Sequence, residues 1–460
     1  MFWQDRRDQD DNIFVVDGGE SYTYREIFDR GDSIFSDLNP SKGVALIAGC
    51  RDFDFVSIYC GALRSNIVPF VVDPTLTLEV VGELLERYKV EYFFSEKNAD
   101  FPNYVAREID CGYHLYCRNE NVADLLFPGL KLLLLTSGST GDAKSVRLSS
   151  ENINICTESV VRYMELNENS VSVSSLPFHY TFGLSILHCA MHARAKILLT
   201  SLSWLDKEFW ALAAGHAVTE LSGVPFMFEM LRRFKVPGEV LENLRCVSQA
   251  GGRLAPDITK HFLEFFGREQ IKYFTMYGQT EAAPRISYVP IDRASEKLGS
   301  IGCPIDIGKF RTDADNGRDR GELIYSGPNV CLGYGIDRSD LAVGDVNGGV
   351  LKTGDIAEID TDGFAYIVGR KKRFVKVYGI SVNLDEIERL AKSVVSTSAV
   401  IGEDDKVLIL ATEDRTDDLK ARVQSRINFP ARALKVIKVD EVFYLNSGKI
   451  DYQRMREQYL

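Results

Sequence analysis

Short apolar runs alternate with longer amphipathic stretches over the first two thirds of the chain. The apolar run at residues 44–48 precedes a helical pattern over residues 52–63. In the same way, the run at residues 68–72 precedes a helical pattern over residues 78–88. Further apolar runs of strand length lie at residues 132–135, 196–199 and 247–250. Continuous apolar strands separated by helices predict parallel sheets buried on both faces, and therefore an α/β fold class.

The pattern changes between residues 299 and 368. Turn-forming pairs separate short strand-like segments there, at Asn316-Gly317, Asn347-Gly348 and Asp362-Gly363. Such pairs are typical of hairpins, so we expect a small antiparallel, β-barrel-like section. After Arg370 a basic stretch leads into residues that mix helical and strand-like patterns. We therefore expect a large domain of stacked α/β subdomains over residues 1–370, a small α+β domain over residues 371–460, and a hinge near Lys372.

Composition and charge narrow the classes of function. Of the 460 residues, 45% are hydrophobic and 26% are charged, which is typical of globular proteins. The formal net charge is -12, whereas a general nucleic-acid binder needs a basic face. No apolar run approaches the ~18 residues of a membrane helix, and the charged N-terminal residues are unlike a signal peptide. We expect a cytoplasmic protein with no membrane span and no nucleic-acid partner.

The cysteines argue against disulfides and zinc. The chain has 9 of them, scattered and without a Cys-x-x-Cys pair. An odd number without paired spacing is typical of neither a disulfide framework nor a zinc site. We interpret these cysteines as small buried apolar residues in a reducing compartment.

A loop rich in hydroxyl groups and glycine follows the apolar run at residues 132–135. It consists of Thr136, Ser137, Gly138, Ser139, Thr140, Gly141, Asp142, Ala143 and Lys144. Glycines let backbone N–H groups approach phosphate oxygens, while the hydroxyl groups add donors and the lysine adds a cation. Taken alone, the same pattern is that of a polar surface turn. It is not a Walker A loop, because only two residues separate Gly138 from Gly141 where that motif has four.

The loop resembles the phosphate loop of the adenylate-forming enzymes, which include acyl-CoA synthetases, aryl-acid ligases, luciferases and peptide-synthetase adenylation domains. Only Ala143 departs from their pattern, which has proline at that place. Further segments similar to this family's motifs are Ala250-Gly251-Gly252-Arg253-Leu254, Met276-Tyr277-Gly278-Gln279-Thr280-Glu281, Gly321-Glu322-Leu323, Gly333-Tyr334, Thr353-Gly354-Asp355, Gly369-Arg370 and Asn446-Ser447-Gly448-Lys449-Ile450. Any one segment could be a surface turn, and it is their order from Thr136 to Lys449 that carries the resemblance.

The resemblance implies an ATP-dependent, AMP-forming ligase with Mg²⁺. A carboxylate attacks the α-phosphate of ATP, and because both reactants are anions, catalysis depends on positioning and charge neutralisation. The implied ATP- and AMP-binding residues are Thr136, Ser137, Gly138, Ser139, Thr140, Gly141, Gly251, Gly252, Tyr277, Asp355 and Arg370. Tyr277 would stack on adenine, while Asp355 and Arg370 would reach the ribose. The implied catalytic residues are Lys144, Thr280, Glu281 and Lys449, and Glu281 would also hold the metal ion.

Two basic features near the C-terminus have competing interpretations. By itself Lys449 is a solvated surface charge, but its Ser-Gly-Lys context and the upstream motifs favour catalysis. The basic run over residues 370–376 is, out of context, a solvated face or a polyanion-binding patch. In the family this segment holds the hinge about which the C-terminal domain rotates between adenylation and thioesterification. The resemblance then places the hinge at Lys372 and has Lys376 and Gly379 line the thiol tunnel.

The segment over residues 176–183 bears on which acid is activated. In amino-acid-activating relatives it places an aspartate against the α-ammonium group, whereas here the matching place holds His179 and we expect no carboxylate nearby. A non-α-amino acid is favoured, since an unpaired buried ammonium group is costly. The resemblance implies that His179, Gly223 and Gly278 line the acid pocket. His179 is also open to interpretation as a hydrogen-bonded core histidine.

Two kinds of molecule fit as the acceptor of the acyl group, and both react through the same thiol. Coenzyme A and the phosphopantetheine of an acyl carrier protein present the same thiol arm, and the sequence does not choose between them. A second hypothesis passes the acyl adenylate to a non-thiol acceptor. A third is a catalytically silent nucleotide-binding relative, against which the presence of Lys144, Glu281, Asp355, Arg370 and Lys449 argues. A P-loop kinase is excluded by the loop spacing and by the downstream motifs.

Overall fold

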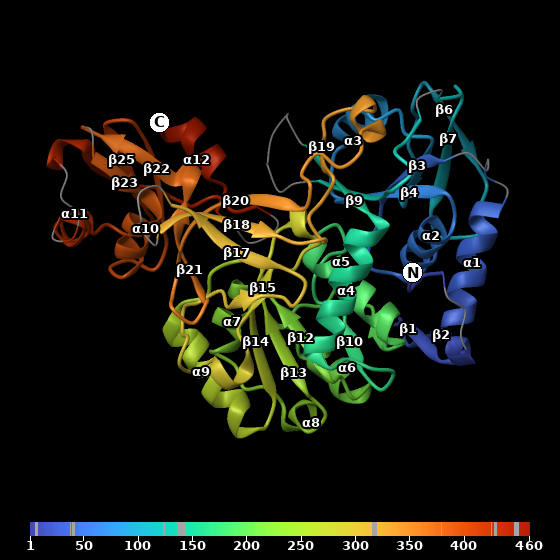
Figure 1. Cartoon of the computed structure of the whole chain (residues 1–460), viewed down its shortest axis with the longest axis horizontal. Coiled ribbons are helices and arrows are strands. Elements are labelled where there is room, and N and C mark those ends of the chain that lie inside the picture. Colours follow the sequence, from blue (N-terminus) through green and yellow to red (C-terminus); the bar gives the residue numbers. More distant parts are fainter. Residues whose placement is uncertain are drawn as a thin grey trace. The chain divides into compact units, whose positions relative to one another are not determined.

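The computed structural model describes residues 1–4, 8–36, 38, 42–122, 125–135, 144–314, 320–378, 380–424, 426, 430–445 and 450–460. Their contacts divide the chain into two compact units. The first comprises Met1–Lys309 with Tyr325–Leu351, and the second comprises Phe310–Ile324 with Lys352–Leu460. Figure 1 shows the elements of both units coloured along the sequence.

The first unit contains a nine-stranded sheet with a parallel centre. In spatial order its strands are β16 (Cys303–Pro304), β15 (Ser287–Tyr288), β14 (Lys272–Tyr277), β13 (Cys246–Gln249), β12 (Glu220–Gly223), β10 (Val171–Val173), β11 (Lys196–Leu198), β1 (Ile13–Asp17) and β2 (Glu20–Thr23). The strands from β14 to β1 pair in parallel, whereas β15, β16 and β2 are antiparallel to their neighbours. The predicted parallel sheet is confirmed at the centre, and the antiparallel edges extend it.

The first unit also contains an eight-stranded sheet. In spatial order its strands are β19 (Gly333–Gly335), β9 (Ser145–Ser149), β8 (Leu130–Leu135), β4 (Ile67–Val72), β3 (Gly43–Ala48), β5 (Tyr92–Ser95), β7 (His114–Arg118) and β6 (Tyr104–Arg107). The four central strands, β8, β4, β3 and β5, are parallel. Every residue of β3 and β4 is buried, which explains why their sequences are continuously apolar.

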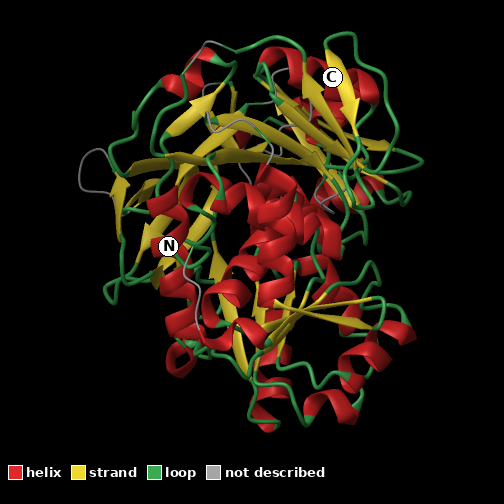
Figure 2. Cartoon of the chain, turned by 90° about the vertical axis from the view of Figure 1, so that its right-hand side faces the viewer, coloured by secondary structure: helices red, strands yellow, loops and turns green. Residues whose placement is uncertain are grey.

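Helices separate the two sheets and cover their outer faces. The helices between the sheets are α1 (Tyr24–Ser36), α2 (Phe53–Arg64), α4 (Ser150–Met164) and α5 (Thr181–Ala193), and Figure 2 shows them as a layer between strands. The outer helices are α3 (Leu78–Arg87) on the eight-stranded sheet, and α6 (Lys207–Gly215), α7 (Pro225–Leu231), α8 (Gly238–Leu241) and α9 (Pro256–Arg268) on the nine-stranded sheet. The predicted α/β fold class with stacked subdomains is confirmed.

Helices α1 and α2 cross at two glycines. A Cβ atom on Gly31 would lie 2.5 Å from the carbonyl oxygen of Ser57, and one on Gly61 would lie 2.4 Å from the carbonyl oxygen of Gly31. Only glycine permits backbones to approach this closely. The crossing therefore fixes how α1 packs on α2 within the central helical layer.

The second unit begins with a four-stranded sheet and ends with a smaller α+β region. The first sheet has the order β17 (Lys309–Asp313), β18 (Arg320–Ser326), β20 (Val350–Ile359) and β21 (Ala365–Arg370). The following elements are β22 (Phe374–Val377), β23 (Ile380–Asn383), α10 (Leu384–Lys392), β24 (Ser398–Glu403), β25 (Lys406–Ala411), α11 (Thr416–Gln424), β26 (Leu434–Lys438) and α12 (Tyr452–Tyr459). Strands β20 and β21 form an antiparallel hairpin whose turn contains Asp362-Gly363, as predicted.

Two expectations from composition can be compared with these elements. Of the helices in the described ranges, none has the length and apolar character needed to cross a bilayer. All nine cysteines are free thiols, and Cys50 is the exposed one. Five are buried (Cys60, Cys156, Cys189, Cys246 and Cys331), as expected for small apolar residues.

Candidate active site

Three of the predicted site segments lie at one edge of the nine-stranded sheet. Gly223 ends β12, Gly251 and Gly252 follow β13, and Tyr277 ends β14. These strands are parallel and in register, with Gly223 beside Gln249 and Gln249 beside Thr275. The carboxyl ends of parallel strands share one edge of a sheet, which is where α/β proteins bind ligands. The fold thus brings together residues separated by about fifty positions in the sequence.

Glycine is required at two of these positions. Gly251 has φ +84°, a backbone conformation that residues with a side chain rarely adopt. A Cβ atom on Gly278 would lie 1.5 Å from the carbonyl oxygen of Pro284. The backbone at residue 278 therefore runs directly against the segment that follows the 280–282 turn.

Side chains from two other elements orient the predicted catalytic turn. Thr280 and Glu281 belong to a single 3-10 turn, Thr280–Ala282, directly after β14. The hydroxyl of Thr181, at the start of α5, donates to the Thr280 hydroxyl at 2.8 Å. The Tyr334 hydroxyl, on β19, donates to Glu281 Oε1 at 2.8 Å. Thr280 thus keeps its own hydroxyl hydrogen for a ligand, and Glu281 keeps its second carboxylate oxygen.

Hydrogen bonds from two buried residues hold the backbone of this turn. Asn329 is fully buried, and its amide nitrogen donates to the carbonyl oxygens of Ala282 and Arg285, both at 2.8 Å. The backbone N–H of Cys331 donates to the carbonyl oxygen of Glu281, also at 2.8 Å. These bonds hold the turn in place before any ligand binds, as a preorganised site requires.

The environment of Glu281 fits a hard cation. Burial and the adjacent Glu281 carboxylate raise the pKa of Tyr334, so Tyr334 stays a neutral hydrogen-bond donor to Glu281. A partly exposed carboxylate with one oxygen still available suits Mg²⁺, which prefers a few protein oxygens together with phosphate oxygens. Within the described part of the chain, no group of three or more His, Cys, Asp or Glu side chains could form an all-protein metal cage. The residues present thus fit a metal ion shared with a nucleotide.

His179 has a carboxylate neighbour, contrary to our expectation. Its Nε2 atom lies 3.5 Å from Asp73 Oδ2, and Asp73 follows β4, far away in the sequence. Burial lowers the pKa of His179, while Asp73 opposes part of this fall. At this distance Nε2 makes no hydrogen bond, so His179 is not a hydrogen-bonded core histidine through that atom. The prediction of no nearby carboxylate is wrong, because the fold brings the residue after β4 close to the segment that precedes α5.

The motif residues of the second unit also meet. Asp355 on β20 pairs in register with Arg370 on β21, and Arg370 Nε lies 3.2 Å from Asp355 Oδ1. The Asp355 side chain is 4% exposed, whereas that of Arg370 is 64% exposed. Glu322 accepts hydrogen bonds from the backbone N–H of Gly354 at 3.2 Å and from Lys371 Nζ at 2.8 Å. Three motifs distant in sequence thus form one cluster of charged side chains.

Of the remaining predicted residues, some are exposed and the others lie outside the described residues. Lys144 is exposed just before β9, and Lys372 and Lys376 are exposed on either side of Arg373. Thr136, Ser137, Gly138, Ser139, Thr140, Gly141, Gly379 and Lys449 lie outside the described residues. The two strands that flank the phosphate loop are described, and Leu135 of β8 pairs with Ser145 of β9. The roles assigned to all these residues stay predictions.

Comparison with known proteins finds similar sequences. Residues 129–335 match the family described as AMP-binding enzyme. A 2-succinylbenzoate–CoA ligase of Geobacillus sp. (strain WCH70) is 31% identical over 287 residues, which cover 61% of this chain and 57% of that protein. Over these residues the chain is thus similar to AMP-binding enzymes and to a CoA ligase. A long-chain-fatty-acid–CoA ligase of Salmonella typhimurium is 30% identical over 341 residues, covering 71% of this chain and 56% of that protein. The aligned region thus spans little more than half of either relative.

Solved structures of adenylate-forming enzymes share the fold. The o-succinylbenzoate CoA synthetase of Bacillus subtilis in complex with its acyl-adenylate intermediate aligns with a TM-score of 0.79, at 19% identity. That alignment covers 97% of this chain and 95% of the synthetase. The same synthetase in complex with ATP and a magnesium ion aligns with a TM-score of 0.77, at 20% identity over 96% of both chains. The fold class inferred from the sequence is therefore confirmed.

Sequence reasoning missed several residues of this candidate site. Thr181 lies in the segment that we interpreted only for His179, and Tyr334 was recognised as part of a motif without a role. Asn329 and Asp73 orient or border the site from other elements. A hydroxyl next to a pocket histidine, and a tyrosine in a family motif, were the available signals. Nothing in the sequence indicates which of them faces Thr280 or Glu281.

Proposed function

We propose that the protein is an ATP-dependent, AMP-forming acid–thiol ligase. The carboxylate of the acid attacks the α-phosphorus of ATP, which forms the acyl adenylate and releases pyrophosphate. The thiol of coenzyme A or of a carrier-bound phosphopantetheine then attacks the acyl carbonyl carbon, which forms the thioester and releases AMP together with the thiol proton. The match of residues 129–335 to the AMP-binding enzyme family and the names of the two relatives support this assignment.

One observation carries the proposal within this chain. Thr280 and Glu281 are held at the carboxyl edge of a parallel sheet by hydrogen bonds from Thr181 and Tyr334. The first step brings two anions together, so the site needs donors and positive charge rather than a proton acceptor. We assign the Thr280 hydroxyl to the α-phosphate and the Glu281 carboxylate to Mg²⁺. When bound, Mg²⁺ would neutralise charge on the phosphates.

The need for donors and positive charge also assigns roles to the other residues of the first step. The 136–141 loop and Lys144 would bind the departing pyrophosphate, and Lys449 would stabilise charge at the α-phosphate. Gly251, Gly252 and Tyr277 would accommodate adenine. The Asp355 carboxylate, which now pairs with Arg370, would accept hydrogen bonds from the ribose hydroxyls.

We further propose that the second step requires movement of residues 371–460. Lys372 lies in an exposed 3-10 turn, Lys371–Arg373, directly after β21. The next residue, Arg373, is buried against Asp385 at 2.7 Å and Glu388 at 3.0 Å, so it belongs firmly to the smaller α+β region. Lys372 therefore lies at the last exposed turn before that region, which suits a hinge. Movement there would bring Lys376 and Gly379 to the thiol tunnel.

We propose a non-α-amino acid as the substrate and coenzyme A as the favoured acceptor. The relatives are named as ligases for 2-succinylbenzoate and long-chain fatty acids, neither of which has an α-amino group, and both are named as CoA ligases. The carboxylate of Asp73 is already 3.5 Å from His179, which leaves it a poorer partner for a substrate ammonium group. His179, Gly223 and Gly278 would then border the reacting end of the acid.

The proposal is tested by ATP–pyrophosphate exchange. The purified full chain is assayed with Mg²⁺ and a panel of alkanoic, aryl, dicarboxylic and α-amino acids, and then with coenzyme A or a holo acyl carrier protein. We expect acid-dependent exchange, followed by thioester and AMP in equal amounts. Exchange without a thioester on either acceptor would contradict the ligase assignment, and no exchange with any acid would contradict adenylation itself.

A further inference from the structure

A buried arginine without a counter-ion lies on the strand that follows the phosphate loop. Arg147 belongs to β9, whose first residue directly follows Lys144, and it is 1% exposed. Within the described part of the chain, no carboxylate lies within 4.0 Å of its nitrogens. Burial lowers the pKa of Arg147, and the more distant Asp340 and Asp345 carboxylates offset only part of this. Because an unpaired buried charge is costly, other groups must compensate it.

Backbone carbonyl oxygens take the place of a counter-ion. The Nε atom of Arg147 donates to the carbonyl oxygen of Tyr334 at 3.0 Å, and Nη2 donates to that of Leu332 at 3.1 Å. The Nη1 atom donates to the carbonyl oxygen of Val343, and both Nη atoms reach that of Gly344 at 3.4 and 3.5 Å. The side chain thus joins β9 to two other segments of the chain, residues 332–334 and residues 343–344.

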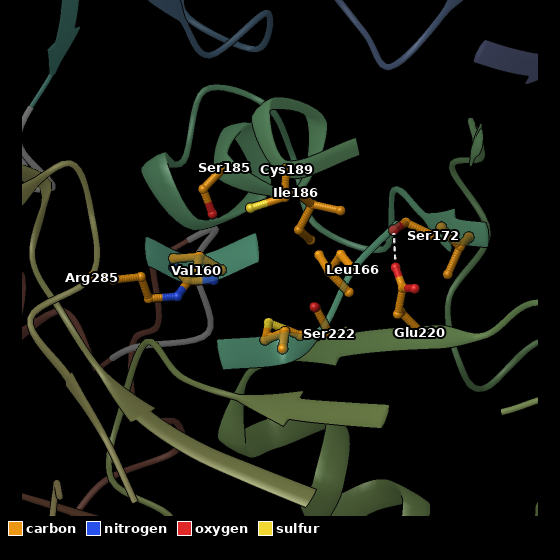
Figure 3. Close-up of a pocket in the computed structure, with 11 residues that line it drawn as sticks. Val160, Leu166, Ser172, Ser185, Ile186, Cys189, Glu220, Ser222 and Arg285 are labelled. Carbon is orange, nitrogen blue, oxygen red and sulfur yellow. Dashed lines mark hydrogen bonds between the residues drawn. The ribbon is translucent and has the colours of Figure 1, made fainter. Parts of the chain in front are cut away.

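A second buried arginine, Arg285, shows the contrast. It borders a cavity of about 20 Å³, which has room for about one water molecule, and Figure 3 shows it among the lining residues. Its Nε atom makes no hydrogen bond to the described residues, although Tyr163 also interacts with this arginine. All three guanidinium nitrogens of Arg147, in contrast, donate to the protein. The role of Arg147 therefore lies in holding chain segments and not in binding a ligand.

The backbone of β19 is shaped to fit this guanidinium group. Gly333 has φ +125°, and a Cβ atom on it would lie 2.9 Å from Arg147 Nη2 and 2.5 Å from a methyl carbon of Val346. In the register of the two strands, Gly333 lies beside Arg147 and Tyr334 lies beside Val146. The Gly333-Tyr334 motif thus has a structural reason here: the glycine admits the arginine, and the next residue is the tyrosine that faces the catalytic turn.

Tyr334 links Arg147 to the carboxylate assigned to the metal ion. Its carbonyl oxygen accepts the hydrogen bond from Arg147, and its hydroxyl donates to Glu281 Oε1 at 2.8 Å. The backbone of the Thr280–Ala282 turn is held separately, by the side chain of Asn329. Loss of Arg147 should therefore displace the tyrosine hydroxyl and the carboxylate it orients, while the turn itself stays in place.

We propose that Arg147 is a positioning residue for the metal ion of the first step: it fixes Tyr334, and through the Tyr334 hydroxyl it sets where the Glu281 carboxylate lies for Mg²⁺. This inference rests on the proposed ligase function. A guanidinium group suits the task, because its planar fork loses little conformational freedom when it holds several oxygens at once. The competing interpretation is that Arg147 serves stability alone, in which case its removal lowers Tm and leaves the dependence on Mg²⁺ unchanged.

The first test measures pyrophosphate exchange against Mg²⁺ concentration. In Arg147→Met, which has a similar length and no donor, we expect the Mg²⁺ concentration for half-maximal exchange to rise at least about fivefold. The KM for the acid should stay within about twofold of wild type. Arg147→Lys, which can donate to some of the carbonyl oxygens, should show a smaller rise. An unchanged Mg²⁺ dependence in Arg147→Met would overturn the inference, and if this variant does not fold, an unchanged dependence in Arg147→Lys would do so.

Arg194→Met is the matched control for the loss of a buried arginine. Arg194 is 3% exposed, ends α5 and lies 3.1 Å from Asp10. The substitution should lower Tm and keep the wild-type Mg²⁺ dependence. All variants are assayed well below their own Tm. An equal rise in Arg194→Met would show a general effect of destabilisation and would overturn the inference.

A double-mutant cycle tests whether Arg147 acts through the tyrosine hydroxyl. The rise caused by Arg147→Met is measured in the wild type and in Tyr334→Phe, which lacks that hydroxyl. We expect the rise to be at least about twofold smaller in Tyr334→Phe, because residues that act through one another are not additive. Equal rises in the two backgrounds would overturn the proposed route.

A binding measurement separates this inference from the ligase function. Thermal unfolding is followed with ATP and Mg²⁺, and with ATP and EDTA, with no acid present. We expect Mg²⁺ to add to the rise of Tm that ATP causes in the wild type, and to add less in Arg147→Met, because weaker binding stabilises less. If no acid supports exchange, the ligase function fails, and this comparison still decides the inference. A smaller Mg²⁺ contribution in the variant supports it, whereas equal contributions, or none in the wild type, overturn it.

Discussion

Two hydrogen bonds orient side chains of the Thr280–Ala282 turn after β14. They predict which substitutions in and around this turn reduce activity most. Thr181 and Tyr334 come from α5 and β19, and each contacts one side chain of the turn. The two bonds go to different residues, so each can be removed separately. The residues that would meet the nucleotide should therefore be much more sensitive than the residues that orient them.

Glu281→Gln should lower pyrophosphate exchange by about a hundredfold or more, because it removes the charge assigned to Mg²⁺. Tyr334→Phe, which removes one hydrogen bond to that carboxylate, should lower exchange by only about two- to tenfold. Exchange is measured over a range of Mg²⁺ concentrations, with Tm as the control for folding. Equal effects of the two substitutions would contradict the assignment of Glu281 to the metal ion.

A second prediction at this scale concerns acid stability. Burial lowers the pKa of His188 from 6.5 to about 3, and its Nε2 atom lies 2.7 Å from the Tyr59 hydroxyl. The unfolded chain takes up this proton below about pH 6.5 and the folded chain does not, so stability is full above that pH and falls as the pH is lowered toward 3. At pH 5 the loss amounts to about 2 kcal/mol.

His188→Asn, which cannot take up a proton in this range, should have a shallower fall of unfolding free energy between pH 7 and pH 5. Denaturant unfolding at several pH values measures this slope, and the comparison of slopes is independent of any loss of packing in the variant. Parallel slopes for wild type and variant would contradict a neutral buried His188.

At the scale of elements, the crossing of α1 and α2 is a sharply constrained contact in the central helical layer. Gly31 and Gly61 each face backbone atoms of the other helix, and backbone cannot move aside as a flexible side chain can. Nearby helical glycines differ: a Cβ atom on Gly267 in α9 would meet nothing within 4 Å. The two kinds of glycine therefore have opposite expected responses to alanine.

Gly61→Ala should destabilise the protein by about 1–3 kcal/mol, because the added methyl group forces the two helices apart. Gly267→Ala is the matched control and should be neutral or stabilising by up to about 1 kcal/mol. It replaces a helical glycine by a better helix former, and the added methyl group points into open space. Denaturant midpoints at constant m-value measure both changes. A neutral Gly61→Ala would show that the crossing tolerates a Cβ atom.

At the scale of the whole molecule, the proposed ligase cycle uses two arrangements of the chain around Lys372. In this proposed cycle adenylation would need Lys449, and thioester formation would need the segment around Lys376. A substitution that restricts the backbone only at the turn should therefore affect one step more than the other.

Lys372→Pro should retain pyrophosphate exchange within about threefold of wild type and lower thioester formation by at least about tenfold, because proline fixes φ at the hinge. Lys372→Ala removes the same charge without restricting the backbone and should affect both steps little. The two half-reactions are measured on the same preparations. Equal losses of both steps in Lys372→Pro would contradict the hinge assignment.

The resemblance to adenylate-forming enzymes, the fold class and the approximate bounds of many elements followed from the sequence, because they depend on neighbours in the chain. Continuous apolar runs such as those that became β3 and β4 are apolar since both faces of the sheet are covered, and the turn at Asp362-Gly363 follows from local backbone preference. The ordered motifs from Thr136 to Lys449 likewise indicated adenylation chemistry before any contact was known.

Only the tertiary structure decided which side chains meet. Thr181 and Thr280 are 99 positions apart in the sequence. The Asp73 carboxylate follows a strand of one sheet and His179 follows a strand of the other. No local sequence pattern therefore predicts either pair. Periodicity and turn chemistry act over a few residues, whereas counter-ions, hydroxyl pairs and cavities arise where the folded path of the chain brings distant residues within a few ångströms.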